Sequence, residues 1–153
     1  MSQSGGARAA AKLEATRGNA ASGTVTFQQS GDMVTVRATV EGLKPGQEHG
    51  FHIHEKGDCS SGDGMSTGGH FNPTGKPHGA QDADHHAGDL PALKADAQGR
   101  VDATFVLAGV GVGSGAADIV GKGLIVHAMP DDFRTQPTGN SGARIACGVI
   151  ARQ

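Results

Sequence analysis

Two stretches with a two-residue period decide the fold: Thr24-Val25-Thr26-Phe27-Gln28 and Val34-Thr35-Val36-Arg37-Ala38-Thr39-Val40. Apolar and polar side chains alternate in both, which is typical of strands with one buried face. Between them, Ser30-Gly31-Asp32 has the composition of a hairpin turn. The same period runs from Ala10 to Glu41, so this part of the chain predicts an antiparallel sheet.

Further short strands are expected after this hairpin, separated by turns. They cover residues 50–55, 101–107, 123–128 and 145–151, and a turn is expected at 43–46. No segment has a long 3.6-residue period. Seven or eight short strands with Gly and Pro turns indicate an all-β sandwich or barrel.

The composition limits what fills the core. The chain has 153 residues, enough for one domain, with 26 Gly, five Phe and neither Trp nor Tyr. A large aromatic core is excluded, so some clamp besides apolar burial is expected. Thirteen basic and fifteen acidic residues give no nucleic-acid footprint. A membrane span is not expected either, because there is no run of about 18 apolar residues.

Two cysteines, Cys59 and Cys147, leave two alternatives. They are either free buried thiols or one disulfide that closes a loop of about 90 residues and adds roughly 4–5 kcal/mol in the chain-entropy model. A structural disulfide would indicate an oxidising compartment. Residues 1–16 contain no apolar segment of the kind found in secretory signals. We therefore expect a periplasmic or extracellular protein whose signal peptide has been removed.

Two long segments lack apolar periodicity, residues 56–99 and residues 129–143. The first contains His70, His78, His85 and His86. Structureless segments of this length in a compact domain are usually functional or disordered. Metal binding is a means of ordering such loops without apolar burial.

The histidine pattern points to a metal site. His52-Ile53-His54 places two imidazoles on one face of a strand, because side chains alternate along it. His127 ends an apolar run, and Asp89 follows the loop histidines. Imidazole suits copper and zinc. These residues predict a His-rich copper or zinc site on a β-scaffold, and by themselves they do not specify a reaction.

Five motifs, in order, carry a family resemblance. They are Gly50-Phe51-His52-Ile53-His54-Glu55, Gly68-Gly69-His70-Phe71-Asn72-Pro73, His86-Ala87-Gly88-Asp89-Leu90, Val126-His127, and the closing run from Gly139 to Ile150. With them, the chain resembles the copper/zinc superoxide dismutases, and Gly57-Asp58-Cys59-Ser60 resembles the bacterial members.

The resemblance implies a Greek-key β-sandwich, or flattened eight-stranded barrel, with two long functional loops. It implies an antioxidant oxidoreductase that converts superoxide to oxygen and hydrogen peroxide, with one copper and one zinc ion per subunit. Superoxide would be the substrate, and the resemblance is compatible with a homodimer. A flexible leader at 1–8 and a single domain at 9–153 are expected.

The resemblance also implies roles for individual residues. Copper ligands would be His52, His54, His70 and His127, and zinc ligands would be His70, His78, His86 and Asp89. His70 would bridge the two ions and carry a proton during catalysis. Asp131 would link a copper ligand to a zinc ligand, Arg144 would attract the anion beside copper, and Cys59 and Cys147 would form the family disulfide.

Several alternatives remain open. His85 competes with its neighbour His86 as a zinc ligand. One alternative is a copper-storage module that does not turn over substrate, but such a module has no evident use for Arg144. Another is a zinc-dependent hydrolase, which would need an open position on zinc, whereas the zinc set here already has four ligands. A copper-only variant would not need His78 or Asp89. A β-sandwich adhesion domain would carry its histidines incidentally.

Overall fold

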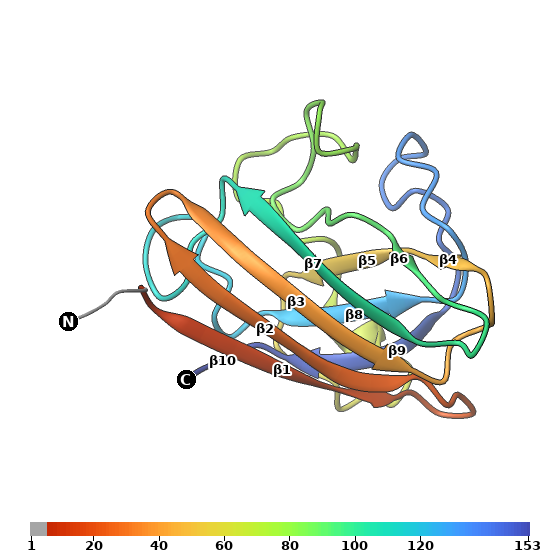
Figure 1. Cartoon of the computed structure of the whole chain (residues 1–153). Helices are drawn as coiled ribbons and strands as arrows, with labels where there is room; N and C mark the ends of the chain where they lie inside the picture. The colour runs from red at the N-terminus through yellow and green to blue at the C-terminus, as the bar shows by residue number, and fades with distance from the viewer. Residues whose placement is uncertain (1–5) are drawn as a thin grey trace.

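The computed structural model describes residues 6–153, which form ten strands and one short 3-10 helix (Figure 1). The strands are β1 (Arg8–Ala15), β2 (Ser22–Ser30), β3 (Met33–Glu41), β4 (Glu48–His49), β5 (Phe51–His54), β6 (Leu93–Lys94), β7 (Val101–Ala108), β8 (Gly123–His127), β9 (Arg144–Val149) and β10 (Ala151–Arg152). The 3-10 helix, η1, spans Met65–Thr67. Within residues 6–153, no helix has the length and apolar character needed to cross a membrane.

One curled, antiparallel sheet dominates the molecule. Its strands follow the order β5-β8-β9-β1-β2-β3-β7, β10 also pairs with β1, and β4 and β6 form a separate two-stranded sheet. The curl lays β1, β2, β3 and β7 over β5, β8 and β9 (Figure 1). This arrangement confirms the predicted all-β fold: the expected sandwich or flattened eight-stranded barrel is a curled eight-stranded sheet.

The hairpin that decides the fold forms as predicted. Ser30 pairs with Met33, so Gly31 and Asp32 make a two-residue turn, and Gly31 has φ 59°. That angle is one that glycine adopts without steric cost. Along β3, every second side chain from Val34 to Val40 is buried, and the side chains between them are exposed. One face of the hairpin therefore supplies the core.

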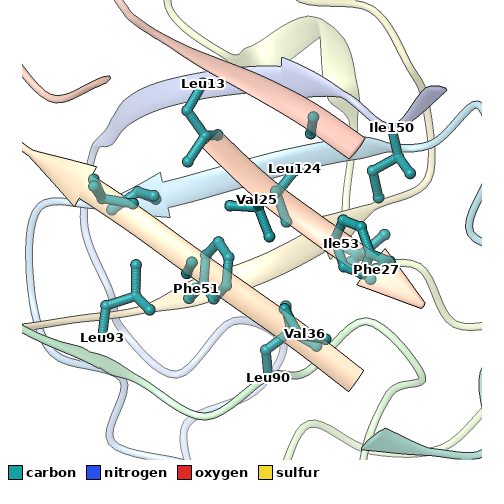
Figure 2. Close-up of a cluster of buried hydrophobic side chains, with 14 of the residues drawn as sticks. Leu13, Val25, Phe27, Val36, Phe51, Ile53, Leu90, Leu93, Leu124 and Ile150 are labelled. Carbon is teal, nitrogen blue, oxygen red and sulfur yellow. The ribbon is translucent and has the colours of Figure 1, made fainter. Parts of the chain in front are cut away.

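The core lies between the two layers of the curled sheet (Figure 2). Its fully buried members include Leu13, Val25, Phe27 and Val36 from one layer and Phe51, Ile53 and Leu124 from the other. Each such side chain contributes about 1.5–3 kcal/mol through burial. A small, mainly aliphatic core of this kind agrees with the composition.

Strands β5 and β8 are buried on both faces, and this feature positions the site. Ile53 and Leu124 face the core, whereas Ile125 is fully buried but lies outside the core cluster. The loop at Gly64 covers Ile125, because a Cβ added to Gly64 would lie 3.3 Å from its Cδ1. The long loop thus packs on the outer face of this layer.

The structure divides the strand predicted at 145–151. β9 and β10 are separated at Ile150, whose backbone turns to a neighbouring segment. Its N–H donates to the Lys122 carbonyl (3.0 Å), and its carbonyl accepts from Gly121 (2.7 Å). The predicted irregular segment 56–99 likewise contains two short regular elements, η1 and β6.

The predicted leader falls mostly on residues 1–5, which lie outside the described residues. Gly6 and Ala7 exchange backbone hydrogen bonds with Gln29, each of 2.9 Å. Arg8 is already the first residue of β1. The described part of the predicted leader therefore extends the pairing of β1 with β2.

Candidate metal centre

Strand β5 presents two imidazoles together, as the His-x-His pattern predicts. The ring centroids of His52 and His54 are 6.2 Å apart, and both side chains are fully buried. Ile53 between them is in the hydrophobic core. The strand therefore carries core packing on one face and imidazoles on the other.

The long loop folds back along the outer edge of β5. Phe71 N–H donates to the Ile53 carbonyl, and Ile53 N–H donates to the Gly88 carbonyl, each at 2.8 Å. A Cβ at position 88 would overlap the Ile53 carbonyl oxygen, so glycine permits this approach. The pairing sets His70 opposite His54 and Asp89 opposite His52.

Four imidazoles converge in the first ligand group. His52 and His54 from β5, His70 from the long loop and His127 at the end of β8 have ligand atoms that all lie within 4.8 Å of one another. All four residues are buried. The expected copper ligands therefore lie together, although they come from three separate parts of the chain.

The second ring nitrogens orient three of these imidazoles. His54 Nδ1 bonds the Gly68 carbonyl at 2.8 Å, and His127 Nδ1 bonds the Gly142 carbonyl at 3.2 Å. His52 Nε2 bonds the Asp131 carboxylate at 2.7 Å. Such contacts fix the tautomer and orientation of a metal-binding imidazole.

The remaining nitrogen of each ring is buried without a hydrogen-bonding partner. These atoms are His52 Nδ1, His54 Nε2, His70 Nε2 and His127 Nε2. A buried polar atom without a partner costs roughly 1–3 kcal/mol. Four such nitrogens in one cluster fit a metal ion that prefers imidazole ligands.

The second ligand group gathers around Asp89. Its Oδ1 lies 2.8 Å from His70 Nδ1, 2.8 Å from His78 Nδ1 and 3.2 Å from His86 Nδ1. His52 also has a ligand atom within 4.8 Å of those of His70, His78 and Asp89. His52 Nε2 is, however, bonded to Asp131, whereas His86 Nδ1 faces the Asp89 carboxylate.

The structure separates the two neighbouring histidines of the loop. His86 faces Asp89, and its backbone N–H also donates to Asp89 Oδ2 at 2.8 Å. His85 instead bonds the carbonyl of His86 at 2.6 Å and lines an outer pocket with Pro73 and Lys76. The geometry thus gives His86, and not His85, the position beside the other zinc candidates.

Asp131 connects the two ligand groups. Its carboxylate accepts one hydrogen bond from His52 Nε2 and one from His78 Nε2, both at 2.7 Å. Burial opposes ionisation, but these hydrogen bonds outweigh it and hold the pKa of Asp131 well below its usual value. Gly139, at φ 74°, packs so closely that a Cβ there would overlap this carboxylate.

Burial keeps three imidazoles of the first group, His52, His54 and His127, neutral. It lowers the pKa of His52 to about 4, that of His54 to about 2 and that of His127 to about 3. His52 is lowered despite its hydrogen bond to Asp131. Neutral imidazole is the form that binds metals, so these side chains are ready to act as ligands.

Arg144, at the start of β9, is half-buried beside the first group. Its Nη1 donates to the carbonyls of Gly64 (3.0 Å) and Gly68 (2.7 Å) and to Thr67 Oγ1 (3.0 Å). The Gly68 carbonyl also binds His54 Nδ1, so a single acceptor connects the guanidinium to the imidazole cluster. Burial lowers the pKa of Arg144, but a guanidinium remains charged at any working pH.

A disulfide joins Cys59 in the long loop to Cys147 in β9, which confirms the predicted disulfide and excludes the alternative of two free thiols. The bond spans 88 positions in sequence. It ties the beginning of the long loop to the strand that carries Arg144. The loop that supplies the acceptors of Arg144 is therefore covalently attached to that strand.

Sequence reasoning did not identify several residues that support the centre. His49 donates from Nδ1 to the His127 carbonyl at 2.8 Å, and Gln47 donates to the Ala128 carbonyl at 2.6 Å. The Phe133 ring stacks on His78 at an interplanar angle of 3°. Thr67 contacts Arg144. These contacts join segments that are distant in the sequence, so no local sequence pattern predicts them.

Comparisons with known proteins agree with this geometry. The family model of copper/zinc superoxide dismutase (SODC) matches residues 21–150. Copper–zinc superoxide dismutase 2 of Brassica juncea is 47% identical over 140 residues, which cover 86% of this chain and 90% of that protein.

Two solved structures share the fold. The crystal structure of the clock protein EA4 has a TM-score of 0.85 at 38% identity, over 94% of this chain and 93% of that chain. A double mutant of a SOD-like protein from Bacillus subtilis has a TM-score of 0.84 at 39% identity, over 93% and 96%.

A curled β-sheet with two adjoining His-rich ligand groups, built from its strands β5 and β8 and its long loop, defines a metalloprotein with two neighbouring sites. The chain belongs to the copper/zinc superoxide dismutase family. It is an antioxidant oxidoreductase that converts superoxide to oxygen and hydrogen peroxide, with copper and zinc as cofactors.

Proposed function

We propose that His52, His54, His70 and His127 hold copper, and that His70, His78, His86 and Asp89 hold zinc. The observation that carries this assignment is that four of the five buried imidazole nitrogens without partners in residues 6–153 belong to this one cluster, the fifth being His49 Nε2. His70 belongs to both sets, because its Nδ1 faces Asp89 whereas its Nε2 is one of the four unpartnered atoms.

Bound copper supplies the one-electron redox couple that superoxide needs, whereas zinc has no redox chemistry. The protein residues provide orientation and protons. His70 can carry a proton at Nε2 and release it to the peroxide product, while Asp89 holds the other side of the ring. Asp131 holds the rings of His52 and His78 in a fixed orientation relative to each other.

Arg144 guides the substrate anion to the copper group. Burial is the main cause of the lowered pKa values of His54 and His127, and the charge of Arg144 lowers both a little further, so its field reaches these side chains. Nη1 is occupied by protein acceptors, so the rest of the guanidinium is available to superoxide. A local positive potential of this kind compensates for the net charge of −2.

The substitution Arg144→Ala tests this role. We expect kcat/KM for superoxide to fall at least about tenfold and its dependence on ionic strength to weaken, with copper and zinc contents unchanged. Arg134→Ala, which removes the exposed cation of the second loop, is the matched control and should change kcat/KM less than about twofold. Loss of copper from Arg144→Ala would instead show a structural role.

The proposal also covers the location, the domain organisation and the oligomeric state of the protein. The Cys59–Cys147 disulfide supports a periplasmic or extracellular location, because structural disulfides persist in oxidising compartments. The family match to residues 21–150 supports a single domain at 9–153. A homodimer rests on the family resemblance, and sedimentation of the metal-loaded protein tests it.

A further inference from the structure

We propose that Thr67 is a positioning residue that fixes the guanidinium of Arg144 for the incoming anion. The inference rests on the proposed role of Arg144. Thr67 ends the short helix η1 within the disulfide-bonded part of the long loop, and it is fully buried. A hydroxyl at that depth requires partners, and the ones it has include the arginine.

The directions of its hydrogen bonds follow from chemistry. Thr67 Oγ1 lies 2.7 Å from the Gly64 carbonyl, which can only accept, so the single hydroxyl hydrogen is donated there. The oxygen is then free to accept from Arg144 Nη1 at 3.0 Å. The contact with arginine therefore has a defined donor and acceptor.

Packing holds the Thr67 side chain in this orientation. A Cβ added to Gly123 of β8 would lie 2.7 Å from Thr67 Cγ2, so the methyl group of Thr67 fills the space that this glycine leaves. β-Branched side chains are already restricted about χ1. The hydroxyl is thus presented to Arg144 from a rigid position.

Three acceptors share the two hydrogens of Nη1 and together restrict the plane of the guanidinium. They are the carbonyls of Gly64 and Gly68 and the Thr67 hydroxyl. Because the guanidinium is planar, fixing Nη1 also fixes Nη2, which makes no hydrogen bond to residues 6–153. The Gly68 carbonyl in addition orients His54, so the arginine is aligned with a proposed copper ligand.

The neutrality of these acceptors matters for function. A carboxylate at this place would orient the arginine equally well, but its negative charge would cancel the local positive potential. A hydroxyl and two carbonyls hold the side chain without placing a negative charge in contact with it, and Asp63 in the same loop acts on Arg144 only through its field. Thr67 therefore contributes orientation without weakening the attraction for an anion.

The experiment compares variants loaded with both metals. Thr67→Val removes the hydroxyl and keeps the shape, Thr67→Ser restores the hydroxyl, and Thr16→Val is the matched control. Thr16 is also buried and also bonds Arg144, but through the Arg144 backbone carbonyl at 2.8 Å. The measurements are metal content, kcat/KM for superoxide at low ionic strength, and the Kd for azide followed by the copper spectrum.

For Thr67→Val we expect the azide Kd to rise about three- to tenfold and kcat/KM to fall by a similar factor. Thr67→Ser should lie within about twofold of the wild type, and so should Thr16→Val. The inference is overturned if Thr67→Val binds azide as the wild type does, or if Thr16→Val weakens azide binding equally. Should Thr67→Val fail to load both metals, Thr67→Ala removes the same hydroxyl without the added methyl group.

The Arg144→Ala variant separates this inference from the proposed function. If Arg144→Ala binds azide and turns over superoxide normally, the role of the arginine itself is wrong. If Arg144→Ala is impaired but Thr67→Val is not, only the positioning role of Thr67 is wrong.

Discussion

The core of the curled sheet and the metal centre are both buried, but the first is made of apolar side chains and the second of polar ones. Side chains such as Val25, Phe27 and Val36 fill the space between the layers, where their burial is itself the stabilising force. In the centre, His52, His54 and Asp89 are equally inaccessible to water. Burial there costs free energy until each polar atom has a partner.

The difference shows how each region obtains its order. The sheet follows from alternation and strand pairing. The centre depends on backbone hydrogen bonds between the long loop and β5, on the disulfide, and on carboxylates that hold the second nitrogens of the rings. Four imidazole nitrogens of the proposed copper group still lack a partner after all of these contacts, and in the proposed assignment the metal ions supply what is missing.

Removing both metals with a chelator should produce the largest effect, and it should affect the metal centre while leaving the sheet intact. We expect superoxide dismutation to fall to background. Amide hydrogen exchange should become at least about tenfold faster in residues 68–90 and 128–143, because metal binding is coupled to the order of its ligand loops. β2 and β3 should remain protected, and mass-spectrometric exchange measures both regions in one sample.

If amide exchange became equally faster in β2 and β3, the distinction between the sheet and the metal centre would be wrong. Such a result would show that sheet and centre unfold as one unit. Adding zinc back alone should restore protection around His78 and His86 without restoring activity.

Asp131→Asn should have the next largest effect and should be confined to the centre. The amide cannot accept both hydrogen bonds that the carboxylate now accepts from His52 and His78. We expect zinc affinity to fall about 10–100-fold, as for other residues that orient metal-binding histidines. Competition with a chromophoric chelator measures this affinity.

The neighbouring exposed Asp132 supplies the control. It accepts hydrogen bonds from Arg134 and Thr135 within its own loop, so Asp132→Asn should leave zinc affinity within about threefold. Equal losses in the two variants would mean that loop structure, and not the link between the ligand groups, determines affinity.

The pH dependence of the metal-free protein should show the smallest effect. Burial lowers the pKa of His52 to about 4 and that of His127 to about 3, whereas both titrate near 6.5 when unfolded. The unfolded chain therefore binds more protons between these values. Stability should decrease as the pH falls from 6.5 toward 4, by about 5 °C in Tm per pH unit.

The contribution of His78 to the pH dependence of stability has the opposite sign. Burial opposes its protonation, but its hydrogen bonds to Asp131 and Asp89 outweigh this and raise its pKa to about 9. Its contribution is complete below pH 6.5 and is lost as the pH rises through 9. Thermal unfolding of the metal-free protein should therefore show maximal stability near neutral pH, and a maximum near pH 4 would contradict the assignment.

The parts predictable from sequence were those with a local period or a recognisable motif. Alternation identified β2, β3 and the turn at Gly31, and the His-x-His pattern placed two imidazoles on one face of β5. The interruption at Ile150 was not predictable, because its backbone partners at Gly121 and Lys122 belong to another segment.

The sequence by itself determined an antiparallel sheet with a thin apolar core, and it supplied the histidines and the family motifs, because these depend on residue type and short spacing. The folded structure was needed to show which nitrogen of each ring is free, that His86 rather than His85 faces Asp89, and that Thr67 contacts Arg144. Those features require the long loop to lie against β5 and β9, and contacts between distant segments are set by packing of the whole chain.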